Sequence, residues 1–297
     1  MLFESTVNRA LVHRSAVSEV LLTDWHSVGS HDFLLGAQWP RGHSFYLPIG
    51  GRWFDPLLMA ETVRQAGLLI AHSAFGVPLD AQFLLEDLNY YVDPAGLAHD
   101  GAPANLSLML ACSDVRSRRS TIAGMRVRVH VLRDGRPLGV GDGLFSCTSA
   151  SVYRRLRGDR IGAKPPAEQW LPQPIRPRLV GRDRLADVVL APLDTPGAWA
   201  VRAHPDHPVL FDHHVDHLPG MTLVEAMRQA ACLVTGCPQL LVTGLDVRFT
   251  RYVEFDRPCV VRAEAHRARQ ERTRVSVVVE QDGEPAATAT LTVRAAG

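Results

Sequence analysis

Apolar and polar positions alternate with two different periods in the first half of the chain. Residues 56–75 are almost continuously apolar, with Asp55 available as an N-cap and Gly76 as a stop, which predicts a helix buried on nearly all sides. The dipeptide Asp134-Gly135 predicts a tight hairpin. A short extended segment is expected near residues 20–25, and alternation predicts half-buried strands at 106–112, 127–131 and 138–144.

The second half repeats this order of elements. The segment LMAETVRQA at 58–66 reappears as TLVEAMRQA at 222–230, and the hairpin DGRP at 134–137 reappears as DGEP at 282–285. LVHR at 11–14 likewise matches LVGR at 179–182. Landmarks repeated in the same order indicate one structural unit written twice.

The repeat predicts matching elements in the second half. We expect a helix over about 219–235, followed by strands at 245–249, 260–266, 275–279 and 287–293. A single buried helix wrapped by an antiparallel sheet is the hot-dog architecture, so the predicted fold class is α+β, a double hot dog. Prolines recur through 161–178, a stretch that sustains neither a helix nor a central strand. The expected domains are therefore 1–160, a proline-rich linker at 161–178, and 179–297.

Charge and cysteine content narrow the functional classes. Lys+Arg number 32 and Asp+Glu 31, a net charge of +1, which argues against a protein held to nucleic acid by bulk electrostatics. No secretory leader or membrane-spanning run is evident, and the 5 cysteines are dispersed without zinc-site spacing. We therefore expect a cytoplasmic protein with reduced thiols, no metal and no membrane partner.

Charged residues on the two apolar helices are the first candidate site. Glu, Arg and Gln recur at matching positions, as Glu61, Arg64 and Gln65 and as Glu225, Arg228 and Gln229. Each Glu–Arg pair has i, i+3 spacing on one helix face. A buried carboxylate costs several kcal/mol (about 3–5 when unpaired) unless it is paired and hydrogen-bonded, so each pair either serves chemistry or simply fixes the helix register.

The loop before the second helix adds further candidates. His213 precedes Pro219-Gly220, where the N–H groups of the first helical turn can face a ligand oxygen, and Glu225 follows inside the helix. Donor N–H groups, a histidine and a carboxylate at one place would suit an acyl carbonyl. In the first half, His43 has a looser similar position. Asp212-His213-His214 also resembles a phosphoesterase metal motif, but no further acidic ligands accompany it.

Together these residues resemble one family. The segments are 12–14 (VHR), 39–46 (WPRGHSFY), 55–56 (DP), 61–65 (ETVRQ), 71–72 (AH), 75–78 (FGVP), 212–213 (DH), 216–217 (DH), 219–221 (PGM), Glu225 and 228–229 (RQ). The chain is similar to the A-factor biosynthesis (AfsA) family of actinomycete signalling-molecule synthases across almost its whole length. His214 departs from the pattern, where proline is expected.

The resemblance implies an acyltransferase that needs no cofactor. Such an enzyme joins a β-ketoacyl group, carried as a thioester on the phosphopantetheine of an acyl carrier protein, to the hydroxyl of dihydroxyacetone phosphate. The product leads to γ-butyrolactone, butenolide or furan autoregulators that control antibiotic production. We expect a monomer or homodimer.

The expected roles follow from this chemistry, since no nucleophile elbow or Cys–His pair is evident. Glu225 is expected as general base, Gly220 as carbonyl polariser, and Arg228 as the partner of Glu225 or of the phosphate. His213 and Glu61 complete the catalytic candidates, and Arg64, Gln65, Gln229 and His43 are the candidate substrate-binding residues. The alternatives are a hot-dog dehydratase or thioesterase acting on acyl thioesters, and a non-catalytic sensor of acyl ligands.

Overall fold

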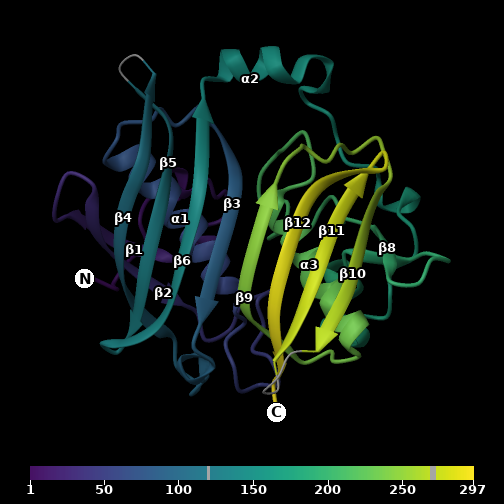
Figure 1. Cartoon of the computed structure of the whole chain (residues 1–297). Helices are drawn as coiled ribbons and strands as arrows, with labels where there is room; N and C mark the ends of the chain where they lie inside the picture. The colour runs from purple at the N-terminus through teal and green to yellow at the C-terminus, as the bar shows by residue number, and fades with distance from the viewer. Residues whose placement is uncertain (119–120, 268–271) are drawn as a thin grey trace. The chain divides into compact units, whose positions relative to one another are not determined.

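The computed structural model describes residues 1–118, 121–267 and 272–297. The chain divides into two compact units, unit 1 (Met1–Asp159) and unit 2 (Arg160–Gly297), which are coloured purple to teal and teal to yellow in Figure 1. Each unit is described by itself.

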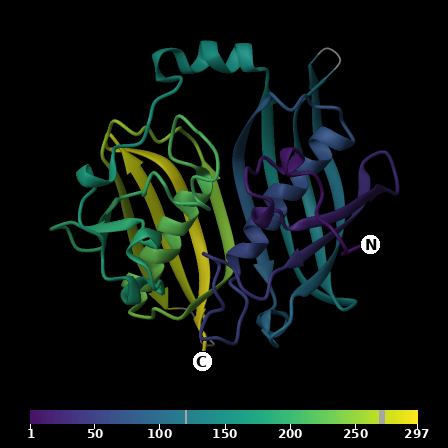
Figure 2. The ribbon, with the colours of Figure 1, turned by 180° about the vertical axis from the view of Figure 1, so that it is seen from behind.

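Unit 1 is a single antiparallel sheet with a long helix on one face. Its sheet has the order β1-β2-β4-β5-β6-β3, and α1 lies against the inner face of the curled sheet, as Figure 2 shows from behind. Short 3₁₀ turns, η1 (Arg9–Val12), η2 (Val17–Glu19) and η3 (Pro94–Leu97), connect these elements. The elements are β1 (Leu22–Ser27), β2 (Asp32–Trp39), α1 (Leu57–Ser73), β3 (Gln82–Val92), β4 (Ala104–Arg118), β5 (Thr121–Arg133), β6 (Arg136–Thr148) and α2 (Ala150–Arg157).

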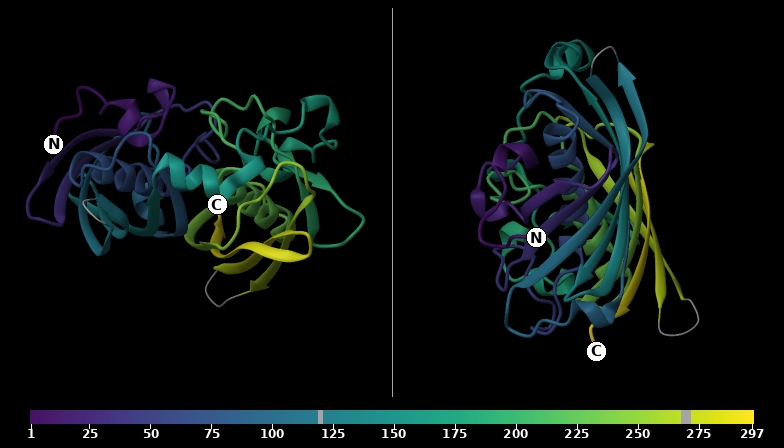
Figure 3. Two further views of the ribbon diagram at one scale, coloured as in Figure 1. Left: turned by 90° about the horizontal axis from the view of Figure 1, so that it is seen from above. Right: turned by 90° about the vertical axis from the view of Figure 1, so that its left-hand side faces the viewer.

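Unit 2 repeats this topology. Its sheet order β7-β8-β10-β11-β12-β9 matches the order in unit 1 strand for strand, and α3 takes the place of α1. Figure 3 shows in two further views how the strands curl around the helices. The elements are η5 (Glu168–Trp170), η6 (Pro177–Val180), η7 (Leu185–Asp187), β7 (Leu190–Pro192), β8 (Ala198–Val201), α3 (Gly220–Thr235), β9 (Leu240–Phe249), β10 (Cys259–Arg267), β11 (Thr273–Gln281) and β12 (Glu284–Ala295). The predicted double hot-dog fold is confirmed.

The two central helices begin and end where local chemistry dictates. The carboxylate of Asp55 accepts a hydrogen bond of 2.9 Å from the N–H of Leu57, the first residue of α1. At the end of α3, Gly236 adopts φ 66° and its N–H donates to the carbonyls of Cys232 and Leu233. Nearly every side chain of α1 and α3 is buried, which confirms the helices expected at 56–75 and 219–235.

The strands expected from alternation are also present, within β4–β6 and β9–β12. Both Asp-Gly dipeptides form hairpin turns with two successive positive φ angles, 52° and 73° at Asp134-Gly135 and 56° and 77° at Asp282-Gly283. Sequence patterns missed β2, β3, β7, β8 and α2. Within 161–178, expected to be free of regular structure, η5 forms and η6 begins. In the described part of the chain, no helix is long and apolar enough to cross a membrane.

Candidate active site

A buried ionic cluster surrounds Glu225 on α3. Arg182, just after η6, donates from Nε and Nη2 to the two carboxylate oxygens at 2.9 and 2.7 Å. Arg228, one turn along α3, donates from Nε and Nη2 at 2.9 and 2.7 Å, and Gln229 adds a bond of 2.7 Å. Burial alone would raise the pKa of Glu225, but the two guanidinium groups outweigh it and hold the pKa at about 2. Glu225 is therefore a buried anion whose carboxylate oxygens accept hydrogen bonds from two arginines and one glutamine.

Unit 1 contains the same cluster around Glu61. Arg14 lies 2.6 Å from the carboxylate, Arg64 2.8 Å and Gln65 2.6 Å. Burial again opposes ionisation, and Arg14 and Arg64 again prevail, so the pKa of Glu61 lies far below its usual range. In both units the glutamine also hydrogen-bonds to the backbone of the segment that precedes the first strand. In unit 1, Oε1 of Gln65 accepts from the N–H of Leu21.

Gln229 makes the matching bond in unit 2, accepting from Val189 N–H. Each cluster thus ties the segment before the first strand to the central helix. This geometry disfavours the general-base role expected for Glu225, because a carboxylate that accepts from two arginines is a poor proton acceptor. It equally leaves Arg228 little capacity for a substrate phosphate, since its Nη2 also donates to the carbonyl of Val180 at 2.8 Å.

His43 has a counterpart that the sequence reasoning missed. Nδ1 of His43 accepts from the N–H groups of Phe45 and Tyr46, and its Nε2 lies 3.3 Å from Glu19. In unit 2, the same bonds are made by a different histidine from the one expected: Nδ1 of His207 accepts from Val209 and Leu210, and Nε2 lies 3.2 Å from Asp187.

Both imidazoles are buried and use both ring nitrogens within the protein. Each histidine links its own loop to an acidic residue just before the first strand of its unit, Glu19 or Asp187. This structural role differs from the substrate-binding role expected for His43. The signal that could have found His207 is its position, the same distance before Glu225 as His43 is before Glu61.

The loop that precedes α3 contains two Asp-His dipeptides with different geometry. The side chain of His213 is 42% exposed, and its Nδ1 lies 3.7 Å from Asp212. His217 is better placed: its Nδ1 lies 2.7 Å from Oδ1 of Asp216, and its side chain is 24% exposed. The Asp216 carboxylate therefore holds the imidazole with its proton on Nδ1, which leaves Nε2 as the basic nitrogen.

Neighbouring groups fix this Asp216–His217 pair. The Tyr252 ring meets the His217 ring edge-on with centroids 4.7 Å apart, and Leu218 N–H donates to Val253 at 2.9 Å. Among the residues that the structure describes, Nε2 of His217 has no hydrogen-bond partner. A partly buried, oriented imidazole with one ring nitrogen available to substrate is the usual form of a general base.

The first turn of α3 lies three residues beyond His217 in the chain. Pro219 accepts from the N–H groups of Thr222 and Leu223, whereas those of Gly220 and Met221 have no acceptor within the described ranges. The hydroxyl of Thr222 is buried and has no hydrogen-bond partner among the residues that the structure describes. The expected placement of Gly220 as a donor site is therefore compatible with the geometry, and the positive end of α3 favours a developing negative charge.

Comparison with known proteins decides the family. The sequence matches the A-factor biosynthesis hotdog domain over residues 3–149 and 163–297. The chain belongs to this family. It is 48% identical over 260 residues to the 2-oxo-3-(phosphooxy)propyl 3-oxoalkanoate synthase of Streptomyces virginiae, covering 88% of this chain and 87% of that protein. It is 38% identical over 275 residues to the enzyme of the same name from Streptomyces griseus, covering 92% and 91%.

Solved structures support the fold of this A-factor biosynthesis hotdog protein. The 12:0-ACP thioesterase from Umbellularia californica has a TM-score of 0.53 at 10% identity, covering 88% of this chain and 94% of that chain. A protein named "oleoyl thioesterase (putative)" from Lactobacillus plantarum has a TM-score of 0.50 at 11% identity, covering 88% of this chain and 96% of that chain. Within 1–118, 121–267 and 272–297, no three His, Cys, Asp or Glu residues are grouped to hold a metal ion.

Proposed function

We propose that this protein is an acyltransferase that joins a 3-oxoacyl group to the free hydroxyl of dihydroxyacetone phosphate. The product is the 2-oxo-3-(phosphooxy)propyl ester of a 3-oxoalkanoate, the compound for which the family's Streptomyces relatives are named. The structural observation that carries the proposal is the Asp216–His217 pair, which lies three residues along the chain before the N–H groups of α3 that have no acceptor among the described residues.

The reaction follows from these groups. Nε2 of His217 accepts the proton of the acceptor hydroxyl while its oxygen attacks the thioester carbonyl. The N–H groups of Gly220 and Met221 hydrogen-bond the carbonyl oxygen as negative charge develops on it. The new C–O bond forms, the C–S bond breaks, and the leaving thiolate takes the proton from His217. Asp216 stabilises the imidazolium and keeps it oriented.

The buried ionic cluster of unit 2 positions this site. Glu225, Arg228 and Gln229 hold the helix that supplies the N–H groups, and Glu61, Arg64 and Gln65 make the equivalent cluster in unit 1. We place the acyl group on the phosphopantetheine of an acyl carrier protein in the cytoplasm. The ester then leads to a γ-butyrolactone-type signal, as the family resemblance implies.

Replacement of His217 tests the assignment. His217→Asn removes the free basic nitrogen, so formation of the phosphorylated ester should fall by about 10²–10⁴-fold. The ester is measured by mass spectrometry after mixing a 3-oxoacyl thioester with dihydroxyacetone phosphate. His214→Asn, a change at an exposed histidine three residues away, should leave the rate near that of the wild type.

Omission of the acceptor separates transfer from hydrolysis. A wild-type protein that releases thiol at the same rate without dihydroxyacetone phosphate would be a thioesterase, and the proposal would be wrong. Full activity of His217→Asn would instead leave the proposed acyltransferase activity standing and reject His217 as its general base.

A further inference from the structure

One helix of the chain lies outside the repeated pattern. The order of two strands, a helix and four strands recurs in both units, and α2 lies between the end of β6 and the first elements of unit 2. α2 begins at an N-cap in which Ser149 Oγ accepts from Val152 N–H, and it ends at Gly158, whose φ is 52°. Unit 2 has no helix that corresponds to α2 among its described residues, so α2 is not required by the repeated fold and its sequence can serve another function.

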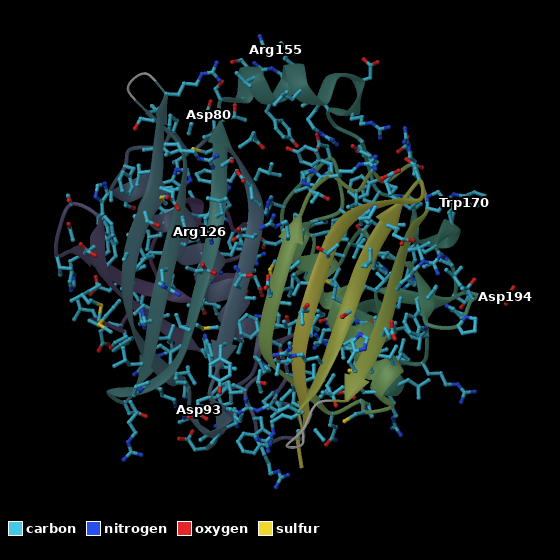
Figure 4. All side chains as sticks on the ribbon, viewed as in Figure 1. Asp80, Asp93, Arg126, Arg155, Trp170 and Asp194 are labelled. Carbon is cyan, nitrogen blue, oxygen red and sulfur yellow. The ribbon has the colours of Figure 1, made fainter. Side chains whose placement is uncertain are left out.

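The exposed side chains of α2 are basic around one large apolar residue. Arg154 and Arg155 are exposed, and Leu156 between them and Arg157 is 69% exposed. Figure 4 labels Arg155 on α2, outside the sheet of unit 1. Within the described part of the chain, neither Arg154 nor Arg155 has a carboxylate partner.

Three arginines on the sheet of unit 1 form ion pairs within that unit. Arg126, labelled in Figure 4, binds Asp87 at 2.7 Å and Asp142 at 3.0 Å. Arg116 lies 3.1 Å from Glu86, and Arg133 lies 3.2 Å from Asp100. These three arginines have acidic partners in unit 1, whereas Arg154 and Arg155 have none among the described residues.

The helix dipole accounts for the position of these arginines but leaves their side chains available. Cations in the last turn of a helix are favourable by about 0.3–1 kcal/mol. The guanidinium forks of Arg154 and Arg155 remain free for bidentate bonds to carboxylates on another molecule. An exposed Leu beside two arginines that have no carboxylate partner among the described residues is typical of a small interface for an acidic, partly apolar surface.

We propose that α2 is the docking helix for the acidic carrier protein that delivers the acyl thioester. This inference rests on the proposed function, since it names the partner that brings the acyl donor. Arg154 and Arg155 steer and hold the carrier through its carboxylates, and Leu156 packs against an apolar residue of the carrier. Because rim charges act mainly on association, the effect falls on the encounter with the carrier and not on the chemical step.

Two acyl donors separate docking from chemistry. The 3-oxoacyl group is presented either on the acyl carrier protein or on N-acetylcysteamine, a small thiol with no protein surface. In the Arg154→Glu/Arg155→Glu variant, kcat/KM for the carrier-bound donor should fall by about tenfold or more, mainly through KM, while kcat/KM for the small donor stays at the wild-type value. Raising the salt concentration should reduce the wild-type kcat/KM for the carrier-bound donor, and so narrow the difference in kcat/KM between the wild type and the variant.

Matched variants control for charge and for folding. Arg136→Glu/Arg294→Glu reverses two other exposed arginines that lie on β6 and β12, and should change neither donor's kinetics. Arg154→Lys/Arg155→Lys should recover most of the carrier activity, and Leu156→Ser should lose part of it. Arg154→Gln/Arg155→Gln keeps a helix-favouring side chain, so its loss of carrier activity cannot come from melting of α2.

The outcomes discriminate between explanations. Equal kinetics of wild type and Arg154→Glu/Arg155→Glu with the carrier-bound donor would overturn the docking proposal. Equal losses with both donors would overturn it too, because they would indicate damage to the active site. Loss of binding to anionic phosphatidylglycerol vesicles without any change in carrier kinetics would assign α2 to a lipid surface instead. Failure of the wild type to form ester from the small donor would reject the proposed function itself.

Discussion

Replacement of Glu225 by glutamine distinguishes a structural carboxylate from a catalytic one. The carboxylate is completely buried, and Arg182 and Arg228, both nearly buried, each donate two bonds to it at 2.7–2.9 Å. Glutamine has the same size, but whichever way its amide is turned, its NH₂ group meets at least two arginine N–H donors. Two buried guanidinium groups then lose their counter-charge.

The expected loss of stability is large. Removing one partner of a buried ion pair typically costs about 3–5 kcal/mol, and the clash of donors places Glu225→Gln in that range. Urea unfolding followed by circular dichroism measures the change as a shift in midpoint at constant slope. Glu284→Gln, at an exposed glutamate, should stay within about 0.5 kcal/mol of the wild type.

The same variant tests the alternative role. If Glu225→Gln unfolds within about 1 kcal/mol of the wild type yet loses ester formation, the structural reasoning is wrong and Glu225 is the base after all. If it is strongly destabilised but retains a measurable rate at low temperature, the carboxylate acts through the position of α3.

Two further predictions concern the acid stability of Glu225 and the buried imidazole of His207. The pKa of Glu225 is depressed from its ordinary value of 4.5 to about 2. The stabilising contribution of the carboxylate is therefore complete above pH 4.5 and is lost as the pH falls towards about 2. The urea midpoint of the wild type should decline across that window, and the midpoint of Glu225→Gln should decline less. His207→Ala removes the Nδ1 atom that accepts from the buried N–H groups of Val209 and Leu210, and it should destabilise the protein by about 2–3 kcal/mol. His214→Ala, at an exposed position, should change the urea midpoint little, and equal midpoints for the two variants would contradict the structural role of His207.

Periodicity was informative where one face of an element meets solvent or where an element is wholly buried. The alternation in β4 and β5 and the long apolar runs of α1 and α3 correspond to their observed burial. β3 was not predicted from the sequence, because buried and exposed residues do not alternate cleanly along it and its pairing with β6 shifts register between Leu85 and Asp87. α2 was not predicted because it has only 8 residues and its arginine-rich sequence lacks the long apolar run that marks α1 and α3.

The sequence by itself determined the duplication, the two buried helices, the Asp-Gly hairpins and the Glu–Arg spacing, because all of these are local patterns of residue type. Only the tertiary structure decided what the charged residues do. The partners Arg14 and Arg182 come from segments 47 and 43 residues away from Glu61 and Glu225, and spacing along one helix cannot reveal them. The different surroundings of His213 and His217 are likewise visible only in three dimensions, where a carboxylate at 2.7 Å and the ring of Tyr252 orient the imidazole of His217. Chemical roles depend on which groups share a desolvated neighbourhood, and the folded chain creates that neighbourhood from segments that are distant in sequence.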